Sequence, residues 1–439
     1  MSASTLSAGA HTTHPPTSDS TVKRVAAASF IGNFVEWFDY ASYIYLASVI
    51  TLVFFPDSSP ASGLLATFAV FALSFIVRPL GGIFWGHFGD KHGRKQALSL
   101  SIIIMSISTF LIALLPSFAQ IGLWAPALLL VLRMVQGFSA SGEYAGAATF
   151  LAEYAPDDKR GLYASIVPAS TAAGLLLGSL FAAGLHALLS AEALQDWGWR
   201  LPFLLAAPLG YIGRYIRLNL EDSPQFQKAL ESNAVEHAPV SVLLKQHGRA
   251  VCIAIGATIL NAVGFYIILG YMPTYLNSIL DVTETQAFMA TTVALASYVG
   301  FILMMGTLSD RFGRKTMLIL ASLVFMLATV PLFKIMGMGG FVGMVLVQVA
   351  FGAMLTMNDG TLPCFLSEIF PTSVRYSGFA FSFNVANALF GGTAPFVATW
   401  LIDVTGNKLA PAWYLVAAAA VALIAMVASR ETANKPLAD

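Results

Sequence analysis

The ten-residue stretch GHFGDKHGRK at residues 86–95 recurs as GTLSDRFGRK at residues 306–315, which is 220 positions later. A second motif repeats at nearly the same interval, since EYAP at residues 153–156 is matched by EIFP at residues 368–371, 215 positions later. Two different motifs repeated at almost one spacing indicate a duplicated unit within the chain. The repeat therefore predicts two structurally equivalent halves.

The composition places both halves in a membrane. Of the 439 residues, 57% are hydrophobic and only 10% are charged, whereas soluble domains carry about 25% charged residues. The 23 Lys and Arg residues are balanced by 23 Asp and Glu residues, so no basic field exists to hold a nucleic acid. These values exclude an ordinary soluble enzyme, a disordered protein and a nucleic-acid binder.

Twelve apolar runs are long enough to cross a bilayer as helices, which requires about 20 mainly apolar residues each. The runs are unbroken rather than alternating, so they favour helices over the strands of a membrane barrel. The sequence predicts an all-α membrane protein with 12 transmembrane helices in two six-helix halves. The expected spans are 25–54, 62–88, 96–116, 121–152, 161–190, 198–218, 249–276, 285–308, 315–337, 340–367, 376–403 and 410–429.

The distribution of charge predicts the topology. Of the 23 Lys and Arg residues, 18 fall on the side of the N-terminus, and the positive-inside rule then places both termini in the cytoplasm. The longest polar stretch separates the halves. We expect a disordered cytoplasmic tail over 1–22, an N-terminal bundle over 23–218, a central cytoplasmic loop over 219–248, a C-terminal bundle over 249–430 and a cytoplasmic tail over 431–439.

The repeated loop motifs predict a gate. Their glycines permit close approach of backbones, and their aspartates suit an arginine partner or a helix N-terminus. Such clusters would hold one conformation and break in the other, as alternating access requires; the alternative is that they only anchor the topology. The predicted gating residues are Gly86, Asp90, Arg94, Glu153, Arg160, Asp310, Arg314, Glu368 and Arg375.

Three carboxylates within predicted spans are candidates for proton coupling: Glu36 and Asp39 in the first span and Glu143 in the fourth. An ionisable residue inside a membrane costs about 2.5 to 3.5 kcal/mol on insertion scales, so it is a functional candidate by default. Burial disfavours the ionised carboxylate, which could therefore load and release a proton. The alternative is a structural pair tied to another helix.

Other polar residues within the spans predict a substrate site. A buried arginine must find a carboxylate, either from the protein or from a substrate, and aromatic rings could hold a cationic group or simply pack. We find no metal-ligand spacing, no nucleotide-binding motif and no catalytic constellation, so neither cofactor nor enzymatic activity is predicted. The predicted substrate-binding residues are Asn33, Tyr40, Tyr43, Arg78, Arg133, Gln136, Tyr266, Asp359 and Asn384.

These motifs in twelve spans resemble the major facilitator superfamily. Within it, GNFVEWFD at residues 32–39, RPLGG at 78–82 and DWGWRLPF at 196–203 resemble the metabolite:proton symporter family. The segment YMPTYL at 271–276 is similar to its proline and glycine betaine carriers. In contrast, Arg133 and FGGTAP at 390–395 resemble its citrate and α-ketoglutarate carriers.

The resemblance implies a proton symporter of a bacterial cytoplasmic membrane that works as a monomer. Its expected substrate is a small zwitterionic osmolyte such as proline or glycine betaine. Two alternatives remain open: a proton symporter of organic carboxylates such as α-ketoglutarate, citrate or tricarballylate, and a receptor that has kept the fold.

Overall fold

The computed structural model describes residues 19–58, 60–232 and 239–438, which form helices and turns without a β-strand. Helices suit this composition because each one pairs its own backbone N–H and C=O groups in lipid. In the described part of the chain, ten stretches are long and apolar enough to cross a bilayer, and a pair of helices bent by 69° makes an eleventh. Helix α11 (Leu201–Leu218) takes the place of the remaining predicted span. The predicted all-α membrane fold is confirmed.

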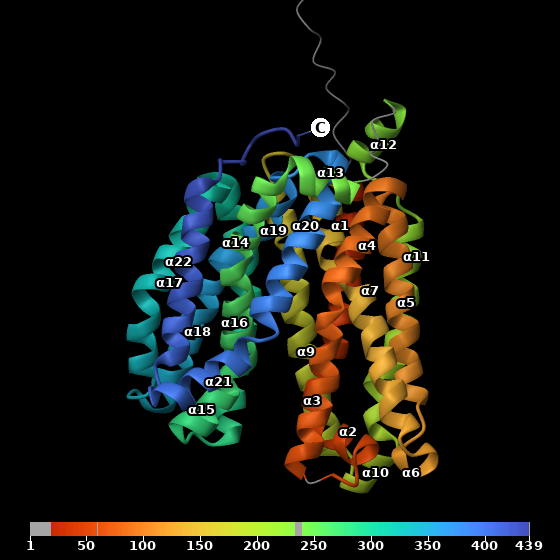
Figure 1. The fold of residues 1–439 in the computed structure, drawn as a ribbon, viewed down its shortest axis with the longest axis vertical. Coiled ribbons are helices and arrows are strands. Elements are labelled where there is room, and N and C mark those ends of the chain that lie inside the picture. The colour runs from red at the N-terminus through yellow and green to blue at the C-terminus, as the bar shows by residue number, and fades with distance from the viewer. Residues whose placement is uncertain (1–18, 59, 233–238, 439) are drawn as a thin grey trace, which may run out of the picture.

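The N-terminal bundle, drawn in red to green in Figure 1, has several rods built from two helices. The first rod bends at Leu46 instead of running straight through residues 25–54. Residues 19–22, expected in the tail, form the first turn of α1, and residues 1–18 lie outside the described residues. Besides α11, the helices of this bundle are α1 (Asp19–Tyr45), α2 (Ala47–Phe54), α3 (Pro60–Ile76), α4 (Arg78–His92), α5 (Arg94–Leu114), α6 (Phe118–Ile121), α7 (Trp124–Tyr154), α8 (Arg160–Ala164), α9 (Ile166–Leu188), α10 (Ala191–Asp196) and η1 (Gly198–Arg200).

The C-terminal bundle repeats this plan beside the first one (Figure 1). Two of its rods contain a π-helical turn, a feature that often occurs at functional sites. The bundle contains α14 (Gly248–Phe265), the π-helix η2 (Tyr266–Tyr271), α15 (Met272–Leu280), α16 (Glu284–Phe312), α17 (Arg314–Met336), α18 (Gly340–Asp359), α19 (Leu362–Glu368), η3 (Thr372–Val374), α20 (Arg375–Ala386), the π-helix η4 (Asn387–Gly391), α21 (Ala394–Thr405) and α22 (Ala410–Ala428).

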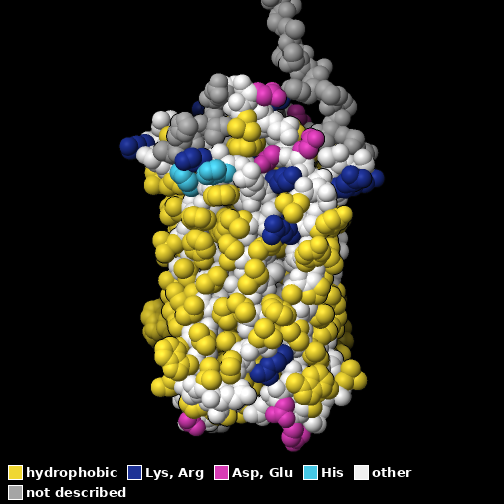
Figure 2. All heavy atoms as spheres, turned by 90° about the vertical axis from the view of Figure 1, so that its right-hand side faces the viewer, with side chains coloured by type: hydrophobic (Ala, Val, Ile, Leu, Met, Phe, Trp, Pro, Cys, Tyr) yellow, Lys and Arg dark blue, Asp and Glu magenta, His cyan; other side chains and the backbone are white. Residues whose placement is uncertain are grey.

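The segment between the bundles carries two short helices, α12 (Pro224–Glu231) and α13 (Pro239–Gln246), while residues 233–238 lie outside the described residues. Figure 1 places α12, α13 and the C-terminus at one end of the molecule. We call this the motif end, because the turns at Gly93 and Gly313 inside the repeated motifs also lie there. Figure 2 shows a broad belt of hydrophobic side chains below it, with Lys, Arg and His side chains gathered toward the motif end.

Helices α4 and α7 of the N-terminal bundle pack against α20 of the C-terminal bundle, and α8 and α9 pack against α16. Glycines make this close packing possible. A Cβ atom at Gly86 would meet the backbone of Ser377, and one at Gly306 would meet the backbone of Gly161. The two bundles therefore touch through their backbones near the motif end.

Candidate functional site

The first repeated motif joins the two bundles through Asp90. Its two carboxylate oxygens accept hydrogen bonds from the backbone N–H groups of Tyr376 (3.1 Å) and Ser377 (2.8 Å) in the first turn of α20. Arg94 pairs with the same carboxylate at 3.1 Å. A negative charge is favoured at a helix N-terminus, so Asp90 holds α20 of one bundle against α4 of the other.

A second carboxylate, Glu153, completes this cluster. It accepts from Arg375 at 2.7 Å and from Arg94 at 3.3 Å, and all three side chains are buried. Arg94 also donates to the carbonyl of Thr372 at 2.8 Å. Because Arg375 and Thr372 belong to the C-terminal bundle, two more contacts of this cluster cross between the bundles.

The second motif builds the equivalent cluster with the bundles exchanged. Asp310 accepts from the N–H groups of Gly161 (2.7 Å) and Leu162 (2.9 Å) in α8. Arg314 pairs with Asp310 at 2.9 Å, and Glu368 accepts from Arg314 at 3.3 Å and from Arg160 at 2.9 Å. The structure thus brings every predicted gating residue into two matched clusters between the bundles. They are Gly86, Asp90, Arg94, Glu153, Arg160, Asp310, Arg314, Glu368 and Arg375.

The residues that follow the last helix of each bundle reinforce these clusters. Asp222 accepts from the N–H groups of Arg94 (3.1 Å) and Lys95 (3.4 Å) at the start of α5, and Glu431 does the same for Arg314 (2.9 Å) and Lys315 (3.1 Å) at the start of α17. Burial raises the pKa of Asp222, although its hydrogen bond to a backbone N–H group and the nearby Arg94 act in the opposite direction.

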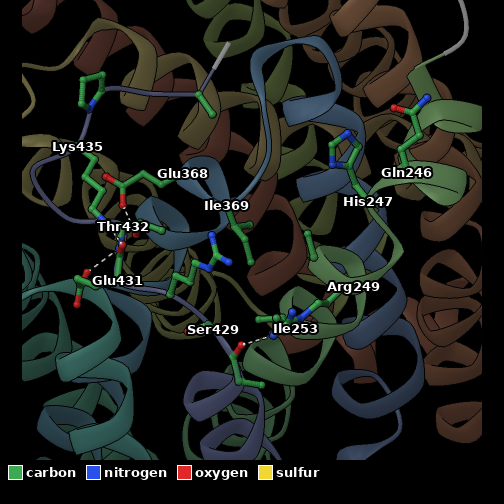
Figure 3. Close-up of a pocket in the computed structure, with 15 residues that line it drawn as sticks. Gln246, His247, Arg249, Ile253, Glu368, Ile369, Ser429, Glu431, Thr432 and Lys435 are labelled. Atoms are coloured by element: carbon green, nitrogen blue, oxygen red, sulfur yellow. Dashed lines mark hydrogen bonds between the residues drawn. The ribbon is translucent and has the colours of Figure 1, made fainter.

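The C-terminal tail then crosses the seam between the bundles, and we call residues 429–438 the strap. The Thr432 hydroxyl donates to Glu368 at 2.6 Å, and the Lys435 carbonyl accepts from Arg160 at 3.2 Å. The Ala438 carbonyl accepts from Arg375 at 2.9 Å. Figure 3 shows Thr432 and Lys435 beside Glu368, at the edge of a pocket of about 460 Å³. The strap therefore adds bonds to arginines of both clusters.

Three buried ion pairs lie deeper in the N-terminal bundle. Glu36 pairs with Arg78 at 2.8 Å, and Asp39 pairs with Arg133 at 2.7 Å. Glu143 pairs with Arg217, which also donates to the carbonyl of Leu98 at 2.8 Å. Each predicted proton-coupling carboxylate thus has its own arginine partner.

A small central cavity lies between the bundles. Trp37, Arg78 and Tyr144 line it from the N-terminal bundle, and Tyr266 and Asp359 line it from the C-terminal bundle. It leaves about 20 Å³ open to the centre of a water-sized sphere, which is room for about one water molecule. The remaining residues that line it are Pro168, Thr171, Asn261, Phe265, Tyr298, Phe383 and Asn387.

Of the predicted substrate-binding residues, Arg78, Tyr266 and Asp359 line this cavity. The predicted substrate-binding residues of α1, which are Asn33, Tyr40 and Tyr43, do not line it, because their side chains turn to other helices. Asn33 donates to Val167, Ser170 and Thr171 of α9, and the Tyr43 hydroxyl donates to the carbonyl of Thr67 in α3. The predicted residues outside the lining are Asn33, Tyr40, Tyr43, Arg133, Gln136 and Asn384.

The other predicted residues have partners within the protein. The Tyr40 hydroxyl accepts from Arg78 at 2.6 Å, and Gln136 donates to Asp39 at 3.3 Å and also to Thr109. Asn384 donates to the carbonyl of Ser141 at 2.8 Å, which is another bond between the bundles. These side chains hold the helices around the cavity rather than forming its wall.

Two important residues were not among the predicted proton-coupling, substrate-binding or gating residues. The charge count includes Arg217 among the 18 Lys and Arg residues on the side of the N-terminus, but its side chain is buried and neutralises Glu143. Its position in the last turn of the sixth apolar run was the available signal, since Glu143 needs a cation. Trp37 lines the cavity next to Glu36, and its sequence position offers no feature that separates it from packing aromatics.

Two bundles with a charged seam at one end and a polar cavity at the centre define a membrane transporter. Comparison with protein families agrees: residues 25–238 match the model described as sugar (and other) transporter, and residues 254–437 match the Major Facilitator Superfamily. The chain belongs to the major facilitator superfamily, and the predicted membership is confirmed.

Named relatives are similar over nearly the whole chain. The glycine betaine/proline/ectoine/pipecolic acid transporter of Dickeya dadantii is 39% identical, and the proline/betaine transporter of Escherichia coli K12 is 38% identical. Each match covers 95% of this chain and 85% of the relative. Among solved structures, the proton:xylose symporter bound to 6-bromo-6-deoxy-D-glucose has a TM-score of 0.81 at 18% identity, and covers 95% of this chain and 98% of that chain. At this identity, the structural likeness speaks for the fold alone.

Proposed function

We propose that the protein imports a small zwitterionic osmolyte, such as proline or glycine betaine, together with protons. The observation that carries this proposal is the central cavity. Arg78 lines it from the N-terminal bundle and Asp359 lines it from the C-terminal bundle. A solute with one carboxylate and one ammonium group can satisfy both charges. Rings of Tyr144 and Phe265 suit the ammonium end. The printed names of the relatives point to the same class of solute.

The alternative of an organic carboxylate carrier receives less support. Arg133, the residue that most favoured it, is fully buried, pairs with Asp39 and lies with its guanidinium 3.9 Å from the centre of the Tyr43 ring. Among the described residues, Arg78 is the one Lys or Arg that lines the cavity. A di- or tricarboxylate would need more positive charge than this cavity offers.

The proposed mechanism is alternating access in a monomer of the bacterial cytoplasmic membrane. With the motif end and both termini in the cytoplasm, the two clusters close the inner side, and rocking of the bundles breaks them. The gating role of the cluster residues and the proton-coupling role of Glu36, Asp39 and Glu143 belong to this proposal. A solute can reach a cavity of this size only if the bundles move apart.

Uptake into proteoliposomes tests the proposal. The labelled solutes are proline, glycine betaine, α-ketoglutarate and citrate, each with and without an inward proton gradient. The proteins compared are the wild type, Arg78→Gln, Asp359→Asn and a control, Asp158→Asn, on an exposed loop. We expect gradient-driven uptake of proline or glycine betaine that a protonophore abolishes and that only the two cavity variants lose. Uptake restricted to the carboxylates would refute the osmolyte assignment. Binding without uptake of any solute would favour a receptor.

A further inference from the structure

Arg78 differs from Arg133 and Arg217, the arginines of the other two deep ion pairs, because it lines the cavity. Its Nη2 atom donates to Glu36 Oε1 at 2.8 Å and to the Tyr40 hydroxyl at 2.6 Å. Its Nε–H group and the second oxygen of Glu36, Oε2, are buried and have no hydrogen-bond partner among the described residues. The pair therefore leaves one buried donor atom and one buried acceptor atom without a partner.

Trp37 supplies another unused donor at the same wall. The side chain lines the cavity, is only 9% exposed, and its indole Nε1–H group has no partner among the described residues. The ring is fixed in place by edge contacts with Phe265 (5.3 Å between centroids) and Tyr40 (5.7 Å). A buried N–H group without an acceptor is costly, so this position suits a group that brings acceptor oxygens.

On the opposite wall the hydrogen bonds of Asp359 are already made, although none of the described Lys or Arg residues pairs with its charge. Asp359 accepts from Asn261 at 2.8 Å and from the Tyr298 hydroxyl at 2.6 Å, one bond on each oxygen. The unused donors of the cavity are therefore concentrated around Arg78 and Trp37, where a carboxylate would find two N–H groups.

We propose that Arg78 exchanges counter-ions during transport, and that this exchange couples one proton to one solute molecule. A proton binds Glu36 at Oε2, the neutral carboxyl releases the guanidinium, and the carboxylate of the solute pairs with Arg78 and accepts from Trp37 Nε1–H. Arg78 keeps one carboxylate partner before and after the exchange, and the complex gains one positive charge, that of the bound proton, because the zwitterionic solute itself has no net charge. The inference rests on the proposed function, and it names the coupling step and its stoichiometry.

The other charged groups near Glu36 are engaged elsewhere. On its own helix, Asp39 is held by Arg133 of α7; Glu143 of α7 is held by Arg217 of α11. Helix α9, which packs along α1, carries no charged side chain before His186 in its last turn. Around Arg78 and the cavity, the remaining titratable groups are Tyr40, Tyr266, Tyr144, Tyr298 and Asp359. Among the described residues, Glu36 is thus the one carboxylate that shares its arginine with the cavity.

The test measures glycine betaine binding to the purified full chain in lipid nanodiscs between pH 5 and pH 9. For the wild type we expect the affinity to fall about tenfold per pH unit once Glu36 loses its proton, because one proton is linked to one solute. In Glu36→Gln the affinity should no longer depend on pH. This variant should still exchange labelled for unlabelled glycine betaine across a membrane, but it should not accumulate the solute with a proton gradient.

The variant Trp37→Phe keeps an aromatic side chain and removes the N–H group. Loss of one hydrogen bond to a charged group should weaken binding about tenfold to a hundredfold at every pH without changing the slope. The matched control is Trp413→Phe, on the exposed face of α22, which should bind like the wild type. Equal binding by Trp37→Phe would refute the carboxylate position.

Other results would overturn the coupling step. Wild-type binding that is independent of pH, or an unchanged pH slope in Glu36→Gln, would refute counter-ion exchange, and the wild-type slope decides even if the variant does not fold. These outcomes differ from failure of the proposed function, in which the wild type neither binds nor accumulates glycine betaine or proline.

Discussion

Asp90→Asn should weaken closure at the motif end. The buried carboxylate accepts one N–H group of α20 on each oxygen, whereas asparagine offers one acceptor oxygen and turns its NH₂ group toward the second N–H group. One hydrogen bond to a charged group is lost, at a cost of about 2 to 3 kcal/mol. The open state is not destabilised by the substitution, because water hydrates the side chain in that state. The open fraction should therefore rise roughly 30- to 140-fold.

Cys364 provides a built-in reporter of this opening. Its thiol is fully buried and donates to Glu368 at 3.3 Å, beneath the ion pair between Glu368 and Arg160 that spans the bundles. With the exposed Cys252 replaced by alanine, an impermeant maleimide added at the motif end should label Cys364. When reclosing is faster than labelling, the rate follows the population of the open state.

The expected result is a labelling rate raised by about the factor calculated for Asp90→Asn, with Asp310→Asn behaving alike because it caps α8 in the same way. The control is Asp158→Asn, an exposed loop carboxylate at the same end, which should label like the wild type. A rate within twofold of wild type in Asp90→Asn, or rapid labelling of the wild type itself, would refute the reasoning.

Three further perturbations follow from the same contacts. Gly86→Leu places a side chain against the backbone of α20 and should hold the motif end open, so that labelling of Cys364 rises and uptake is lost. The control Gly184→Leu has open space around it and should change neither labelling nor uptake. Glu143→Gln leaves Arg217 buried without its carboxylate and should destabilise the protein by about 3 to 5 kcal/mol in thermal unfolding; an unchanged melting temperature would contradict this. Deletion of residues 432–438 removes the bonds of the strap to both arginine clusters and should speed thiol labelling by about tenfold or more, and an unchanged rate would show that the strap does not contribute to closure.

Several features of this protein were accessible from the sequence because their signals are local. Long apolar runs and the 220-residue repeat predict the helical membrane fold and its duplication, since each helix satisfies its own backbone. The repeated motifs also predict which residues meet at the seam, because a buried aspartate and arginine next to a tight glycine turn have few possible environments. Asp90 and Asp310, in equivalent positions, make equivalent contacts.

The tertiary structure alone decided which buried charges pair and which of them face the cavity. Glu36 and Asp39 lie less than one helical turn apart, yet they bind arginines 42 and 94 residues away on different helices. The pairing of Arg217 with Glu143 could not be predicted from the sequence, because Glu143 lies 74 residues earlier on another helix. A helix displays side chains on every side, and only its packed neighbours determine which side becomes the wall of a cavity and which becomes a helix contact. For this reason the chemistry of single positions could be predicted from the sequence, whereas the exchange proposed at Arg78 required the fold.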